Sequence, residues 1–268
     1  MSMYGDAVRS VLRRNRPSTV PVASVALSGA TVDRGHLAAY NRVCGFRLGD
    51  ALPATYPHVM AFPLTMRLMA GADFPFPLVG IVHLANRITV AGPLSAAGRW
   101  DFTVHAENLR PHDRGRQLDV VAMGTVDGVE VWRGVSTYLH RSGSSGSSGS
   151  SAGVARVAPP PASATWHVPA RVGTDYARVS GDHNPIHTSR IGARLLGFRR
   201  PIAHGMWSKA RCLAALEGRL PDAYTVEVAF KRPILLPATV AFSATPATSF
   251  ALHDPKTGAP HLTATLTG

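Results

Sequence analysis

The sequence predicts an α+β protein made of two similar units, in each of which an antiparallel sheet packs on one central helix. Two observations support this prediction. The run SGSSGSSGSSAG (residues 142–153) and the three prolines at 159–161 divide the 268-residue chain near its middle, because a Gly- and Ser-rich segment cannot bury surface. On each side, a helical apolar stretch is followed by strand-like segments and turn residues. We therefore expect domains at residues 1–141 and 164–268, joined by a linker at 142–163 of natural or engineered origin.

In the first unit we expect a helix near Phe62–Ala70 and a strand over Val79–Val90. A meander of three more strands follows, since runs rich in β-branched and aromatic residues are separated by turn residues. These strands are predicted at Trp100–Asn108, Gln117–Thr125 and Val129–Leu139, with turns at His112–Gly115 and Asp127–Gly128.

In the second unit, apolar residues recur at three- and four-residue steps and predict a helix over Trp207–Leu220 with one buried side. Alternation of apolar and polar residues then predicts a strand at Tyr224–Arg232. Two further strands are expected within Ala251–Leu266, on either side of the turn residues Asp254–Gly258. Each unit is thus predicted to be one helix followed by a meander.

The composition argues against a membrane span, because no stretch of 18 or more apolar residues occurs. The basic run at residues 13–16 and the apolar segment Val20–Ala30 imitate a secretion signal, but Pro21 interrupts that segment. The two cysteines, Cys44 and Cys212, belong to no metal-binding or redox spacing, which suits a reducing compartment. We expect a cytoplasmic protein without a metal.

The net charge of +12 and the sequence pI near 10.8 favour an anionic partner. Nucleic acid is one candidate, but the arginines are scattered, no nucleic-acid-binding signature occurs, and aromatic residues make up only 7% of the chain. A phosphate-bearing coenzyme or an acidic carrier protein is the partner that we favour.

The segment with the clearest chemical content contains an acid and a base on one short turn. Asp182 and His187 are separated by Asn184 and Pro185, and Gly181 precedes the acid. Pro185 fixes its own φ and pushes the preceding residue into an extended conformation, so the segment is expected to be a shaped turn rather than a continuous helix. An Asp and a His presented from such a turn can divide proton transfer between them.

His204 and Gly205 open the predicted helix of the second unit. Backbone N–H groups at a helix start lack intrahelical partners and can stabilise a developing oxyanion, and Gly205 would let a substrate carbonyl approach the backbone. Taken singly, Asp182 reads as a turn residue and His187 as a packing residue. The combination of an acid/base pair with an oxyanion donor favours catalysis.

The strings SGDHNPIH (residues 180–187) and PIAHGM (residues 201–206) resemble those of the MaoC-like (R)-specific enoyl-CoA hydratases and 3-hydroxyacyl-thioester dehydratases. The resemblance implies a double hot-dog fold, in which two antiparallel sheets each wrap a central helix and join into one continuous sheet. It also implies a hydro-lyase that adds water reversibly to a fatty trans-2-enoyl thioester carried on coenzyme A or acyl carrier protein, with no other cofactor.

By the same resemblance, Asp182 and His187 would activate water or, in the reverse direction, abstract the α-proton and protonate the leaving hydroxyl. The amide of Gly205 would form the oxyanion hole. The remaining motif residues would support the site, and Asn184 would order the loop or hold the water; these supporting residues are Asn184, Ser180 and His204.

The first unit departs from this pattern, because no Asp/His string precedes Tyr56. His58 and His204 nevertheless stand at corresponding places before the two central helices, which indicates a duplicated unit. We therefore expect one active site per chain, a first unit that shapes the acyl tunnel, and a monomer or homodimer. Basic residues are expected at the mouth of the tunnel, where they would bind the carrier: Arg199, Arg200, Lys231 and Arg232.

Two alternatives share the predicted fold. A hot-dog thioesterase would hydrolyse the thioester, but such enzymes usually place a carboxylate on the central helix, and Met206–Leu213 contains none. Glu217 comes too late to fill that place. A non-enzymatic acyl-thioester-binding protein would leave Asp182 and His187 without a purpose.

Overall fold

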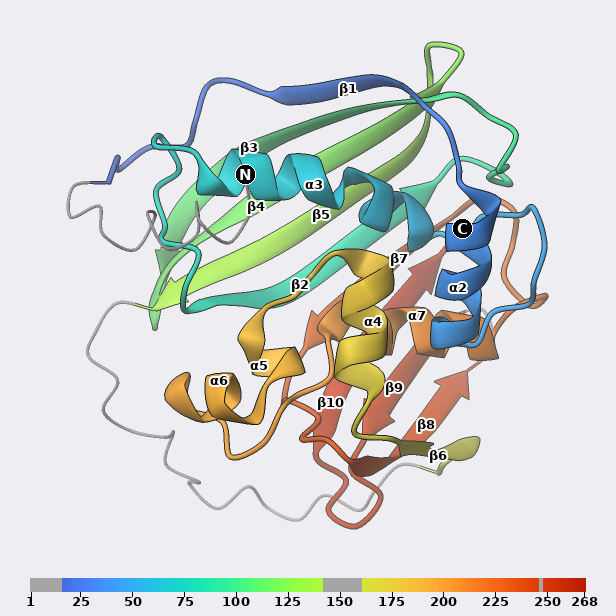
Figure 1. The fold of residues 1–268 in the computed structure, drawn as a ribbon. Coiled ribbons are helices and arrows are strands. Elements are labelled where there is room, and N and C mark those ends of the chain that lie inside the picture. The colour runs from blue at the N-terminus through green and yellow to red at the C-terminus, as the bar shows by residue number, and fades with distance from the viewer. Residues whose placement is uncertain (1–15, 142–160, 246–247) are drawn as a thin grey trace.

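The computed structural model describes residues 16–141, 161–245 and 248–268. Its strands form one ten-stranded antiparallel sheet in the order β1-β3-β4-β5-β2-β7-β10-β9-β8-β6 (Figure 1). The first five strands in this order are β1 (Val25–Ala30), β3 (Trp100–His112), β4 (Gly115–Val126), β5 (Val129–Arg141) and β2 (Ile81–Val90). The other five are β7 (Tyr224–Phe230), β10 (Pro260–Thr267), β9 (Ser249–His253), β8 (Ala238–Thr245) and β6 (Ala164–Val168).

The strand order is symmetric about the β2–β7 pair, as a duplicated unit requires. In each half, the strand that follows the central helix lies at this junction and pairs with the last strand of that half, and the strands farther out follow in reverse sequence order. The pairing of Ala85–Val90 with Tyr224–Ala229 makes the two half-sheets continuous. This confirms the predicted α+β layout with a joined double sheet.

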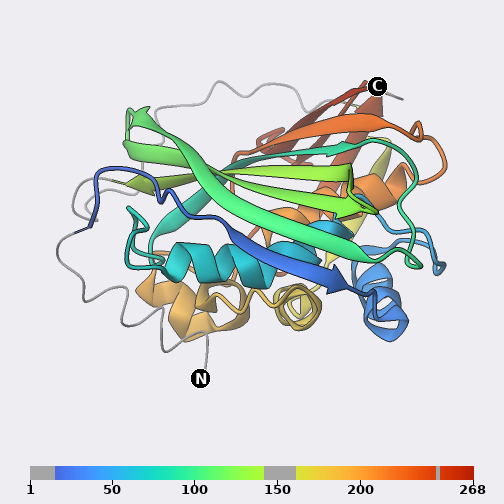
Figure 2. The same ribbon diagram turned by 90° about the horizontal axis from the view of Figure 1, so that it is seen from above.

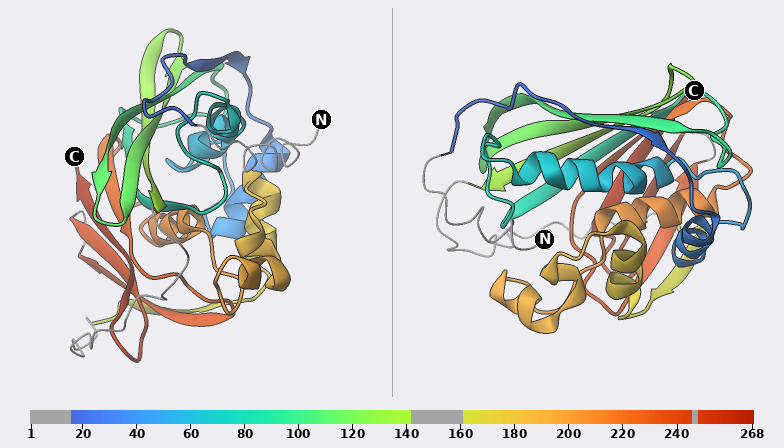
Figure 3. Two further views of the ribbon diagram at one scale, coloured as in Figure 1. Left: turned by 90° about the vertical axis from the view of Figure 1, so that its left-hand side faces the viewer. Right: turned by 45° about the horizontal axis from the view of Figure 1, so that its top comes forward.

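The helices lie on one side of the sheet (Figures 2 and 3). Helix α3 packs on β1, β3 and β4 of the first half, and α7 contacts β9 of the second half, so each half-sheet has its own central helix. The six helices of the described residues are α2 (Arg34–Cys44), α3 (Tyr56–Ala70), α4 (Val172–Ser180), α5 (Pro185–Thr188), α6 (Arg190–Leu195) and α7 (Gly205–Ala215). None of them is long and apolar enough to cross a membrane.

Local sequence explains the hairpins. Asp127 and Gly128 have φ angles of 51° and 78°, the left-handed pair that a two-residue hairpin loop between β4 and β5 requires. Between β9 and β10, the carboxylate of Asp254 accepts hydrogen bonds from the amides of Lys256 and Thr257. Both turns lie where the sequence predicted them.

Several predicted boundaries were wrong. Helix α3 begins at Tyr56 instead of Phe62, because a proline is tolerated in the first turn of a helix. Helix α7 ends at Ala215 and not at Leu220, and Gly218 soon afterwards has a left-handed φ of 79°. Strand β2 begins at Ile81 rather than Val79, and β7 ends at Phe230 rather than Arg232.

The sequence prediction also missed elements at the periphery, namely β1, α2, β6, α4, α6 and β8. The proposed linker at 142–163 lies mostly outside the described residues, so its role and the domain boundaries stay predictions.

A buried lysine crosses the junction between the halves. Lys209 on α7 is fully buried, and its Nζ donates to the side-chain oxygen of Asn86 (2.6 Å), the backbone oxygen of Asn86 (3.1 Å) and that of Val226 (3.2 Å). Burial lowers the pKa of Lys209 well below its ordinary value. The lysine thus ties the central helix of the second half to β2 of the first half.

Candidate active site

The turn between α4 and α5 presents the predicted acid. Gly181 ends α4 in the left-handed conformation with φ of 76°, which lets the chain reverse immediately before Asp182. The Oγ of Ser180 accepts from the amide of Asp182 (3.2 Å), and one carboxylate oxygen of Asp182 accepts from the amide of Asn184 (3.2 Å). The side chain of Asn184 in turn accepts from the amide of Ile186 (3.2 Å) and caps α5. The two supporting residues that we predicted here hold the turn in shape.

His187 lies on α5, a single helical turn that begins at Pro185; the helix is interrupted between Gly181 and Asn184, as the predicted shaped turn requires. The ring is buried, and its Nδ1 lies 2.8 Å from the carbonyl oxygen of Ile202. Since a carbonyl only accepts, Nδ1 carries the proton and Nε2 keeps its lone pair. Burial lowers the pKa of His187, although Asp182 and the Ile202 carbonyl oppose this shift. The ring is therefore a neutral base.

The carboxylate of Asp182 is one-third exposed. Burial acts to raise the pKa of Asp182, but the neighbouring rings of His204 and His187 and the amide of Asn184 lower it by more, and the net pKa lies below its ordinary value. At neutral pH, Asp182 is therefore ionised and His187 is neutral. Two proton acceptors thus stand side by side.

His204 contacts both Asp182 and His187. Its Nε2 donates to the backbone oxygen of Asp182 (2.9 Å), and its ring stacks on that of His187 with 3.6 Å between centroids. Burial, with the neighbouring His187, lowers the pKa of His204 to about 3, so the stacked pair carries no charge at neutral pH. The ring of Tyr176 on α4 lies 4.9 Å from that of His204, between centroids.

Gly205 is the first residue of α7. Within the residues that the structure describes, no hydrogen bond engages its amide, as expected at a helix start. A Cβ at this position would lie 2.9 Å from the ring of Phe230, so only glycine allows the helix to start so close to β7. Gly205 thus starts the helix as predicted, and its role as the oxyanion donor stays a prediction.

Two further glycines set the position of the turn. A Cβ on Gly173 of α4 would overlap the backbone oxygen of His187, and a Cβ on Gly192 of α6 would overlap the ring of Pro185. The three helices α4, α5 and α6 therefore touch backbone to backbone. Sequence reasoning missed both glycines, since neither occupies a turn.

The first half was predicted to shape the acyl tunnel, and two of its histidines lie near the candidate site. A bulge between His83 and Ala85 in β2 turns His83 to the helix side of the sheet. Its ring stacks on Tyr138 (4.7 Å) and lies 4.9 Å from Phe230, the residue that touches Gly205. The Nε2 of His83 is buried, and no hydrogen bond to it exists within the described chain. A polar residue in the otherwise apolar start of β2 was the signal available in the sequence.

His58 is the second of these first-half histidines. Burial, reinforced by Lys209, lowers the pKa of His58 to about 4, while the nearby Asp182 opposes this shift. Burial, with His58 and Lys209 nearby, lowers the pKa of His83 to about 3. Both first-half imidazoles are therefore neutral polar groups whose pKa values the charge of Asp182 influences.

The four basic residues predicted to bind the carrier do not form one cluster. All four are exposed. They flank two segments, one around Ile202 and one around Leu235, that pair in antiparallel orientation. Arg199 and Arg200 therefore lie toward one end of this pairing, and Lys231 and Arg232 toward the other.

Asp182, His187 and His204 together have the composition of a metal site, and one potential ligand atom of each lies within 4.8 Å of the others. A zinc ion, however, requires each nitrogen to point at it from about 2.0–2.1 Å. The rings of His187 and His204 are stacked with 26° between their planes, and Nε2 of His204 already bonds Asp182. The geometry suits proton transfer better than a metal; the absence of a metal stays a prediction.

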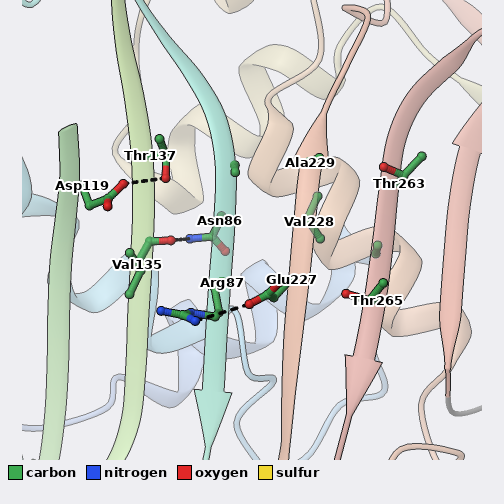
Figure 4. A pocket seen from close by; sticks show the side chains of 12 residues that line it. Asn86, Arg87, Asp119, Val135, Thr137, Glu227, Val228, Ala229, Thr263 and Thr265 are labelled. Carbon is green, nitrogen blue, oxygen red and sulfur yellow. Dashed lines mark hydrogen bonds and ion pairs between the residues drawn. The ribbon is translucent and has the colours of Figure 1, made fainter. Parts of the chain in front are cut away.

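A separate hollow crosses β4, β5, β2, β7 and β10 on the face of the sheet opposite the helices (Figure 4). It holds the Arg87–Glu227 ion pair and the buried Asp119. None of the predicted site residues lines it, so this hollow is not the candidate active site.

Comparison with known proteins gives a consistent result. The family model described as "MaoC like domain" matches residues 159–256. The 3-hydroxyacyl-thioester dehydratase X of Mycobacterium tuberculosis is 40% identical over 258 residues, which cover 94% of this chain and 92% of that protein. A crystal structure of HtdX from the same organism has a TM-score of 0.81 at 38% identity, over 92% of this chain and 100% of that one. A MaoC-like dehydratase from Phytophthora capsici shares the fold with a TM-score of 0.70 at 17% identity, over 93% and 95% of the two chains.

Proposed function

The chain belongs to the MaoC-like dehydratase family, and on that premise we propose that it reversibly adds water to trans-2-enoyl thioesters and removes it from (R)-3-hydroxyacyl thioesters. It is a hydro-lyase. The observation that supports the chemistry most directly is the pairing of an ionised Asp182 with a neutral His187, whose Nε2 accepts no hydrogen bond from the described residues.

In the hydration direction, one water molecule donates its two hydrogens to the carboxylate of Asp182 and to Nε2 of His187. Its oxygen forms a bond to C3 of the enoyl group as one of its protons passes to the pair, and the π electrons move toward C2 and the thioester oxygen. The amide of Gly205 stabilises the charge that develops on this oxygen. C2 then takes a proton from the pair, which returns the enzyme to its starting state.

Dehydration runs through the same steps in reverse. One member of the pair removes the C2 proton, the C3–O bond breaks, and the hydroxyl leaves as water with a proton from the pair. Ser180, Asn184 and His204 support this chemistry by fixing the loop and backbone of Asp182. The division of labour between the two proton carriers is part of the proposal.

A thioesterase is the second candidate, and one feature counts against it. Helix α7 (Gly205–Ala215) carries no carboxylate, and Glu217 lies beyond its end, where its side chain accepts from the amide of Arg47 (3.0 Å). Glu217 is therefore occupied away from the site. A binding protein without activity would have no need for an ionised carboxylate beside a neutral imidazole.

The remaining expectations belong to this proposal. The substrate is a fatty acyl group on coenzyme A or acyl carrier protein, with no further cofactor. We place the enzyme in the cytoplasm as a monomer or homodimer with one active site per chain. The absence of the Asp/His string from the first half supports the single site.

The decisive experiment follows the ultraviolet absorbance of the conjugated enoyl thioester, for chain lengths from crotonyl to long-chain substrates. We expect the absorbance to fall on hydration, the thioester to stay intact, and the product to be the (R)-3-hydroxyacyl form. Release of free thiol without loss of the double bond would identify a thioesterase instead. An unchanged substrate at every chain length would contradict an enzymatic role.

A further inference from the structure

Helix α6 and the loop that follows it carry an unusual exposed surface. Ile191 and Leu195 are 73% and 81% exposed, more than most large apolar side chains of a folded protein. Exposed arginines surround them. We call the set the α6 surface, and it consists of Arg190, Ile191, Arg194, Leu195, Arg199 and Arg200.

The α6 surface is ordered into two stripes. Ile191 and Leu195 are four residues apart and therefore lie on one face of the helix, while Arg190 and Arg194 form a second pair on the neighbouring face. Within the described part of the chain, no ion pair neutralises any of its four arginines. The surface therefore offers apolar area and uncompensated positive charge together.

This surface is fixed relative to the candidate catalytic residues. The Oγ of Ser189 caps α6 by accepting from the amide of Gly192 (3.1 Å), and Gly192 packs directly on Pro185. Beyond α6, the amide of Ile202 donates to the backbone oxygen of Ile186 (3.0 Å), next to His187. Figure 1 shows α6 beside α5 at the periphery of the fold. A partner bound to α6 would stand next to the site and outside it.

We propose that the α6 surface docks an acidic carrier protein that presents the acyl chain as a thioester on a phosphopantetheine arm. This inference rests on the proposed function and names its partner. The four arginines complement an acidic helix, and Ile191 with Leu195 complement the apolar residues of such a helix. The phosphates of coenzyme A could use the charge, but they leave the apolar stripe without a partner. An anionic bilayer could use both, but α6 is only six residues long and offers little area for insertion.

The test uses one acyl chain on two carriers, acyl carrier protein and coenzyme A, with the full-length enzyme. The variant Ile191→Ser with Leu195→Ser keeps every charge and removes only the apolar stripe. Its control is Val129→Ser, which removes a 63% exposed apolar side chain from a first-half hairpin. We expect the stripe variant to lower kcat/KM for the protein-bound substrate by roughly tenfold or more, the effect of losing anchor residues from a protein interface. For the coenzyme A substrate, kcat/KM should change less than about threefold, and the control should alter neither.

Four results would overturn the inference. Unchanged kinetics with the protein-bound substrate would show that the stripe does not meet a carrier, and equal losses on both carriers would show a disturbed active site. If the stripe variant kept its carrier kinetics but lost binding to phosphatidylglycerol vesicles, the surface would belong to a membrane contact. If it kept its carrier kinetics but changed its elution volume in gel filtration, the surface would belong to a contact with a second copy of the chain. A wild-type enzyme that hydrates neither substrate would contradict the proposed function itself, so the two failures are distinguishable.

Discussion

Protonation states at single residues decide what the candidate site can do. A carboxylate and a neutral imidazole can both accept a proton at neutral pH, and the surroundings of Asp182 and His187 maintain these two states by different means. The acid is stabilised as an anion by the neighbouring rings of His204 and His187 and by the amide of Asn184, whereas the base is kept neutral mainly by burial. The roles of Asp182 and His187 in proton transfer can therefore be tested separately.

We expect Asp182→Asn and His187→Gln each to lower turnover by roughly 10²–10⁴-fold, a typical contribution of general acid–base catalysis. Because the two act on the same proton, the double variant should be little worse than the poorer single one. Steady-state hydration of an enoyl thioester measures this, with His183→Ala in the same loop as the control. A folded single variant with near wild-type turnover would remove that residue from the mechanism.

His83 tests the contribution of the first half. We expect His83→Phe, which keeps the aromatic packing but removes the buried Nε2, to change KM or chain-length preference while kcat falls less than about tenfold. The reason is that the ring lines the site through Phe230, whereas the proton carriers come from the second half. Kinetics over a series of acyl chains provide the measurement. A loss of kcat as large as that of Asp182→Asn would make His83 part of the chemistry.

At the scale of elements, the site depends on how closely three short helices pack. Helices α4, α5 and α6 are too short to be stable alone, so their mutual contacts place the acid and the base. Gly173 and Gly192 allow these contacts, and Lys209 anchors α7 to the sheet. Changes at these residues should affect function or stability without touching substrate.

Gly173→Ala should displace α5, because its Cβ would occupy the space of the His187 backbone oxygen. We expect kcat to fall at least about tenfold, since small misplacements of catalytic groups are costly, while KM changes little. The control is Arg178→Ala on the exposed side of the same helix. Equal activity of both variants would show that α4 does not position His187.

Lys209→Met should lower the free energy of unfolding by roughly 1–3 kcal/mol, because it leaves the buried side-chain oxygen of Asn86 without its partner. Adding Asn86→Leu should restore part of this loss, since it removes the unpaired oxygen, and only part because it also removes the hydrogen bond from Asn86 Nδ2 to Oγ of Ser136 (3.1 Å). Urea unfolding measures both variants, with the exposed Lys231→Met as the control. A double variant less stable than Lys209→Met would contradict this account.

For the whole molecule, three histidines that are buried or half-buried make stability depend on pH. The pKa values of His58, His83 and His204 are lowered to about 4, 3 and 3, whereas the unfolded chain should titrate near the ordinary value of 6.5. Between these values the unfolded state binds more protons than the folded state, so stability is complete above pH 6.5 and is lost as the pH falls toward 4.

The expected result is a steady decrease in the free energy of unfolding from pH 7 to pH 4.5, measured in urea. His58→Gln should flatten this dependence, because glutamine does not titrate, whereas His112→Gln in the β3–β4 hairpin should leave it unchanged. A pH dependence identical in all three proteins would show that His58 is not a buried neutral group.

Much of the fold could be predicted because its signals are local. Alternation along β7 and the Asp127–Gly128 dipeptide specify a strand and a hairpin without reference to the rest of the chain. The turn around His187 could not be predicted in full, because Pro185 is compatible with both a break and a helix start. The inward turn of His83 depends on a bulge whose cause lies in the pairing of β2 with β5. Contacts between segments that are distant in the sequence cannot be predicted from the local pattern of apolar, polar and turn residues.

The symmetric junction at β2 and β7 has an evolutionary consequence. In a symmetric dimer of single units, one gene encodes both sides, and every mutation appears twice. Here the two halves are encoded separately within one reading frame, so a mutation in one need not occur in the other. Once the second half kept the reactive loop, selection on the corresponding loop of the first half could relax, and its positions became free to adapt to the shape of the substrate.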